Sequence, residues 1–143
     1  MLSGGCIFIE HATGYVIIKH QVSINANKTF KAKLNFGREA QIQGVVIKGY
    51  HTDNGICNAS EFMEELLNKQ QKIIFIRAGA SHQNGAVDFS IKTVVTMKRT
   101  MLIHAVLRYP EDTFSTDIFP MEIYYALWFY NWISNMQTRL SAI

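Results

Sequence analysis

The run VVIKGYHTDNG at positions 45–55 joins a β-branched apolar segment to an acid and an Asn-Gly pair. Val and Ile favour strands and Asn-Gly favours tight turns, so this run predicts a strand over 45–50 with Asp53 just past its carboxyl end. Open α/β sheets bind their ligands at that edge. An Asp beside Asn-Gly can also serve only as a turn former, because its side chain hydrogen-bonds the local backbone. Asp53 is therefore a candidate site residue with two interpretations.

Two other parts of the chain have strand patterns. Segments 5–10 and 15–22 are rich in Ile, Val and Phe and flank the turn-like residues 11–14, which predicts a β-hairpin. KIIFI at 72–76 predicts a further buried strand.

Four segments have apolar residues at helical spacing. They cover residues 25–44, 60–70, 86–107 and 120–136. Asn25 or Asn27 is the expected N-cap of the first segment, and Gly44 is its expected stop. Asn58 or Ser60 is the expected N-cap of the second segment. The order of strands and helices predicts an α/β fold, a mixed sheet flanked by helices, in a single domain over residues 1–143.

The apolar faces of these helices predict which side chains are buried. Phe30 and Leu34 share a face of the first helix, and Phe62, Leu66 and Leu67 share a face of the second. The last helix has aromatic residues on almost every side, so we expect it in the core, and an exposed part would indicate self-association. These aromatic residues are Tyr124, Tyr125, Trp128, Phe129, Tyr130 and Trp132.

Composition excludes several classes of protein. Fourteen Lys and Arg against eleven Asp and Glu give a net charge of +3, which permits a polyanionic partner without requiring one. Cys6 and Cys57 are too few for a disulfide framework or a four-thiolate zinc site, so we expect a reducing compartment, the nucleus or cytoplasm. The apolar run at 123–133 is shorter than the ~20 residues that span a bilayer, so no membrane segment is expected.

A second acid, Asp88, stands where the long third helix begins, just after His-Gln-Asn-Gly at 82–85. Two carboxylates at the ends of elements can converge on a hard divalent cation. Such a cation can serve phosphoryl transfer. The alternative is that Asp88 is favoured only by the helix macrodipole, which stabilises acids in the first turn.

Three stretches carry a family resemblance: VVIKGYHTDNGICNASEF at 45–62, the run from FIRAGASHQNG to HAVLRYP at 75–110, and DIFPMEIYYALWFYN at 117–131. They resemble the integrase catalytic core of Copia-type retrotransposons, which has YHTDNG, a loop with HHQNG and a long helix ending near RTMLxHAxLRWP. The opening residues 4–26 are similar to the second and third strands of that family. The resemblance covers nearly the whole chain.

The resemblance implies a ribonuclease H-like fold and a site of two Asp and one Glu that holds two divalent metals. Asp53 matches the second acid and Asp88 stands in the place of the Glu, with Mg²⁺ or Mn²⁺ as the implied cofactor and DNA as the implied partner. The first acid of the family lies on a central strand upstream of the hairpin, and Glu10 does not match it. We therefore expect a fold without its first strand and weak or absent DNA strand transfer. The sheet is expected in two pieces, unless these pair with each other or another chain fills the gap.

The resemblance also implies contacts to DNA from the loop before the third helix and from the helix itself. The alternative for the loop is a polar segment whose Asn caps the helix. The alternative for Lys92 is an i,i+4 pair with Asp88, and the alternative for Lys98 and Arg99 is a solvated basic face. The candidate residues are His82, Gln83, Asn84, Lys92, Lys98 and Arg99.

Two other functions compete with integration. One is a non-enzymatic remnant of a transposable element that binds nucleic acid or forms homo-oligomers. The other is a ribonuclease acting on RNA–DNA hybrids, which shares the implied fold but does not account for the His-Gln-Asn-Gly loop. A dinucleotide site is excluded because no G-x-G-x-x-G follows a strand.

Overall fold

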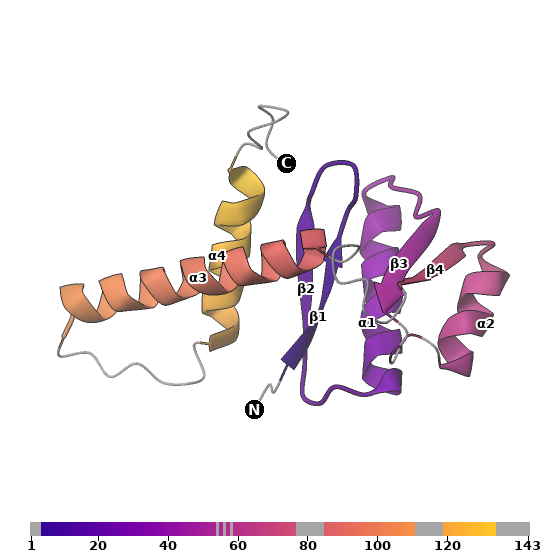
Figure 1. The fold of residues 1–143 in the computed structure, drawn as a ribbon, viewed down its shortest axis with the longest axis horizontal. Helices are drawn as coiled ribbons and strands as arrows, with labels where there is room; N and C mark the ends of the chain where they lie inside the picture. The colour runs from indigo at the N-terminus through magenta and orange to yellow at the C-terminus, as the bar shows by residue number, and fades with distance from the viewer. Residues whose placement is uncertain are drawn as a thin grey trace. The chain divides into compact units, whose positions relative to one another are not determined.

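The computed structural model describes residues 4–53, 55, 57, 59–76, 85–110 and 119–133. Four strands and four helices follow one another in these ranges (Figure 1). They group into two compact units, one formed by residues 1–20 and 86–143 and the other by residues 21–85. The single domain over 1–143 stays a prediction.

The first unit contains a β-hairpin and two helices (Figure 1). Strands β1 (Gly4–Ile9) and β2 (Val16–Gln21) form a two-stranded sheet, as the sequence predicts. The turn between them is closed by the amide of Glu10, which donates to the carbonyl of Tyr15 at 2.8 Å. Helix α3 (Gly85–Arg108) confirms the long helix, and α4 (Phe119–Trp132) begins next to Pro120 as predicted.

The core of the first unit joins the hairpin to both helices. Val16 of β2, Val94 of α3, and Ala126 and Leu127 of α4 form a buried cluster. Partly buried side chains from both strands of the hairpin and from both helices pack around it, including Ile7, Ile18, Met97 and Ile123. Apolar burial is the main stabilising contribution to a unit of this size.

Only part of α4 is in this core. Ala126, Leu127 and Asn131 are buried, but most of the aromatic side chains are exposed. The helix was expected in the core, with any exposed part indicating self-association, and the structure shows both a buried face and an exposed aromatic part. The exposed aromatic residues are Tyr124, Tyr125, Trp128, Phe129 and Trp132.

The second unit contains a βαβ element and a preceding helix. Its elements are α1 (Ala26–Ile42), β3 (Gly49–Asp53), α2 (Ser60–Asn68) and β4 (Lys72–Ile76). Strands β3 and β4 pair in parallel with a register that runs from Gly49 opposite Lys72 to Asp53 opposite Ile76. Parallel neighbours need a crossover, and α2 supplies it.

The start of α1 confirms the predicted cap. Asn25 is the N-cap, and its Oδ1 accepts a hydrogen bond from the amide of Lys28 at 2.9 Å. Asn25 thereby satisfies one of the free donors at the start of the helix.

The end of α1 explains why the strand predicted over 45–50 is placed wrongly. Gly44 follows the helix with a φ of 73°, which glycine adopts without strain. The amide of Val45 then donates to the carbonyl of Ala40 at 2.8 Å, as in a Schellman motif. Val45 therefore belongs to the helix end, and β3 begins only at Gly49.

Two predictions for α2 are also wrong. The N-cap is Ala59, with no side-chain hydrogen bond, and Ser60 is already helical. Leu67 is 74% exposed, whereas Phe62 and Leu66 are buried as predicted. The buried face of α2 contains Phe62 and Leu66, four residues apart, and excludes Leu67, so it is narrower than the predicted apolar face.

The described strands form two separate two-stranded sheets, which agrees with the expected pieces of sheet. No helix within the described part of the chain is long and apolar enough to cross a membrane.

Candidate functional site

Asp53 is the last residue of β3, at the carboxyl end of a parallel pair. The sequence predicts it just past the strand, and the later start of β3 accounts for the difference.

The strand β3 can begin at Gly49 because this residue has no side chain. A Cβ at this position would lie 2.7 Å from the carbonyl oxygen of Lys72. Asp53 therefore lies at the edge where parallel α/β sheets place their chemistry.

Asp88 lies in the first turn of α3 and is exposed. Peptide dipoles give the start of a helix a partial positive charge, which stabilises a carboxylate there. Asp88 belongs to the first unit and Asp53 to the second, and the structure describes each unit by itself. The convergence of Asp53 and Asp88 on one cation stays a prediction.

The structure describes three of the six candidate DNA contacts. Lys92 and Arg99 are exposed on α3, and no ion pair among the described residues joins Lys92 to Asp88. Lys98 is buried, and its Nζ lies 3.6 Å from Oε2 of Glu122. His82, Gln83 and Asn84 lie outside the described residues.

A divalent metal such as Mg²⁺ needs several oxygen ligands. Asp53 and Asp88 supply carboxylate oxygens, which Mg²⁺ and Mn²⁺ prefer. Within the described ranges, no group of three or more His, Cys, Asp or Glu side chains could hold a metal ion. The described side chains therefore do not by themselves form a three-carboxylate centre.

Glu10 has a structural role at the hairpin turn. Its Oε1 accepts from the amide of Ala12 at 3.0 Å, and its Oε2 accepts from the amide of Thr13 at 2.6 Å. A hydrogen bond from the Thr13 side chain is the largest cause that lowers the pKa of Glu10, followed by the one from Ala12. Glu10 is therefore an ionised turn-forming carboxylate.

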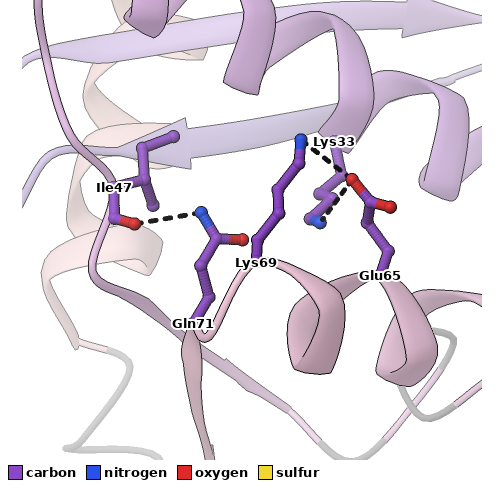
Figure 2. A network of polar contacts seen from close by, with 5 residues as sticks. All are labelled: Lys33, Ile47, Glu65, Lys69 and Gln71. Atoms are coloured by element: carbon purple, nitrogen blue, oxygen red, sulfur yellow. Dashed lines mark hydrogen bonds and ion pairs between the residues drawn. The ribbon is translucent and has the colours of Figure 1, made fainter.

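One polar cluster in the second unit was missed by the sequence analysis. Lys33 of α1 is 2% exposed and points toward α2 (Figure 2). Its Nζ lies 5.7 Å from the ring centroid of Tyr50 and 5.5 Å from that of Phe62. Oε1 of Glu65 lies 4.0 Å from the same Nζ. We call these four residues, Lys33, Tyr50, Phe62 and Glu65, the Lys33 cluster.

The apolar pattern of the sequence did not reveal the inner face of α1. Thr29, Ala32 and Lys33 are the buried residues of this helix, and they share one helical face. The pattern predicted burial for Phe30 and Leu34 instead, and these are only half-buried. Two of the three buried residues are polar, so a search for apolar spacing does not find them.

No protein-family model and no curated relative matches the chain. Among solved structures, a chain of the simian T-cell lymphotropic virus intasome in complex with PP2A regulatory subunit B56 gamma is similar, with a TM-score of 0.74 and 14% identity. The match covers 95% of this chain but only 45% of that one, so this chain spans less than half of its length.

The HTLV-2 integrase catalytic core domain is also similar, in two structures with magnesium. The trimeric form has a TM-score of 0.68 at 17% identity over 96% of this chain and 82% of that one. The dimeric form has a TM-score of 0.66 at 18% identity over 96% and 81%. These likenesses show that the chain has the fold of an integrase catalytic core.

Proposed function

We propose that this chain derives from the integrase of a Copia-type retrotransposon and that its ancestral reaction is metal-dependent DNA strand transfer. In that reaction a 3′-hydroxyl of element DNA loses its proton and attacks a phosphorus of target DNA, so that a new P–O bond forms while the bond to the 3′-oxygen of the target strand breaks and that oxygen leaves. The fold likeness and the HTDNG run support the proposal. The observation that carries it is the position of Asp53 at the carboxyl end of β3, parallel to β4.

In this proposal Asp53 and Asp88 hold Mg²⁺ or Mn²⁺. Divalent metals in such sites stabilise the attacking and leaving oxygens of an in-line displacement. The side chain of Asp88 is shorter than the Glu of the family by one carbon–carbon bond, roughly 1.5 Å. Catalytic groups need placement to within about 0.5 Å. We therefore propose that residues 1–143 alone join DNA weakly or not at all.

A strand-transfer assay in Mn²⁺ tests this proposal. We expect little joining by the parent chain and more joining by Asp88→Glu, which restores the longer ligand arm. Any joining must disappear in Asp53→Asn and persist in Glu64→Gln, which neutralises an exposed carboxylate on α2. Joining that survives Asp53→Asn would refute the role of Asp53.

The competing proposal is a remnant that binds DNA without joining it. Lys92 and Arg99 support it because both are exposed on the same helix. Lys98 stays a predicted contact, but its ion pair with Glu122 has to open before it can reach a phosphate. DNA binding that weakens with salt, together with no joining by Asp88→Glu, would favour the remnant.

We also propose that α4 mediates self-association. Its exposed rings contact one another: Trp128 lies 5.2 Å from Phe129 and 5.6 Å from Trp132, centroid to centroid. Contiguous exposed apolar patches mark interaction sites. The two HTLV-2 cores were solved in dimeric and trimeric forms, which supports the proposal.

Sedimentation velocity over a range of concentrations measures this association. We expect Trp128→Glu to shift the distribution toward monomer while its circular dichroism matches the parent. Leu67→Glu is the control, because Leu67 is an exposed apolar residue on α2. Equal association by Trp128→Glu and the parent would exclude α4 as the interface.

A further inference from the structure

The buried amine of Lys33 supports an inference that is independent of the proposed function. Its Nζ is buried and has no hydrogen-bond partner in the structure. A lysine is almost never fully buried unless its charge is paired. The partners available to Lys33 therefore decide which protonation state the folded unit prefers.

Two elements pack against the amine and present charged or titratable groups to it. From α2, Oε1 of Glu65 lies 4.0 Å away and is shared with Nζ of Lys69 at 2.8 Å (Figure 2). From β3, Tyr50 presents its ring, and its hydroxyl is buried without a hydrogen-bond partner. Glu65 is thus closer to the half-exposed Lys69 than to the buried Lys33.

This arrangement stabilises the cation only in part. The faces of Tyr50 and Phe62 attract a positive charge. Loss of hydration opposes it, and burial is the largest cause that lowers the pKa of Lys33. Glu65 raises this pKa and Lys69 lowers it. Glu65 itself stays ionised, because the hydrogen bond from Lys69 lowers its pKa.

We propose that Lys33 is a proton-controlled contact between α1 and the β3–α2 layer: loss of its proton tightens the packing of α1, and uptake loosens it. In the unfolded chain the lysine titrates near its usual pKa of ~10.4. Between the lower folded pKa and ~10.4, the unfolded chain binds more protons than the folded one. Lys33 therefore contributes stability to the second unit that rises with pH across this window. Tyr50 opposes this at the top of the window, because burial raises the pKa of its hydroxyl to about 12.

The titration of Lys33 is the first test. We would record the ¹³Cε signals of the lysines in the full chain against pH and assign Lys33 by its absence in Lys33→Met. Its midpoint is expected below those of the other lysines and should move upward in Lys69→Met, because Lys69 lowers this pKa. A midpoint among those of the exposed lysines would overturn the proposal.

The second test is urea unfolding followed by the methyl signals of Leu66 and Ile76, which are buried in the second unit. The unfolding equilibrium constant of the parent should fall by up to about tenfold per pH unit within the window. Lys31→Met removes an exposed lysine from the same helix and should keep this slope. Lys33→Met should lose it, and equal slopes in the two variants would refute the proposal.

Discussion

At the scale of single residues, Asn131 of α4 makes the most specific contact in the first unit. Its Oδ1 accepts from the amide of Val16, and its Nδ2 donates to the carbonyl of Val16, both at 2.9 Å. One side-chain amide thus pairs with both backbone groups of a buried strand residue, much as a neighbouring strand would. The contact spans 115 positions of sequence, so no local pattern could have predicted it.

Replacing Asn131 by Leu should destabilise the first unit by about 2–6 kcal/mol, because two buried backbone groups lose their partners at about 1–3 kcal/mol each. Urea unfolding followed by tryptophan fluorescence measures this, since both tryptophans, Trp128 and Trp132, lie on α4. Asn35→Leu, at an exposed position of α1, is the control. A loss below about 0.5 kcal/mol would show that the amide contact contributes little.

At the scale of elements, the close approach of β3 to β4 depends on Gly49. Gly49→Ala places a Cβ 2.7 Å from a backbone carbonyl of Lys72, so the strand pair must shift. Gly37→Ala is the matched control, because Gly37 lies in α1 with nothing within 4 Å of its Cβ position.

Thermal unfolding followed by circular dichroism should separate the two glycine variants. We expect Gly49→Ala to destabilise the second unit and Gly37→Ala to stabilise it by up to about 1 kcal/mol, the helix propensity difference between Gly and Ala. Equal unfolding temperatures would mean that the strands tolerate the added methyl group.

The elements also show how far the sequence could predict the fold. The hairpin, α1 and α3 were predicted because apolar spacing and local caps such as Asn25 determine them. The start of β3 was not predicted correctly. It depends on the helix end at Val45 and on close contact with β4, a strand more than twenty residues away in the sequence. The burial of Lys33 was missed for the same reason, because its partners come from other elements.

At the scale of the whole molecule, the two acids of the proposed site belong to different units, Asp88 to the first and Asp53 to the second. An apolar run followed by a turn signal is a local pattern, and it predicted Asp53 just past a strand over 45–50, whereas Asp53 is the last residue of β3. The convergence of Asp53 and Asp88 stays a prediction, because the two acids lie in different units and local turn or capping patterns carry no information about distant contacts. The resemblance alone connects the two acids.

The most direct test of the account is paramagnetic broadening by substoichiometric Mn²⁺ in the amide spectrum of the full chain. We predict that the signals of Thr52 and Val87, each next to one acid in the sequence, broaden together. Both effects should vanish in Asp53→Asn and in Asp88→Asn and persist in Glu64→Gln. Broadening near only one acid, or broadening that survives Asp53→Asn, would contradict a shared metal site. The HTDNG run would then reflect descent from an integrase without metal binding.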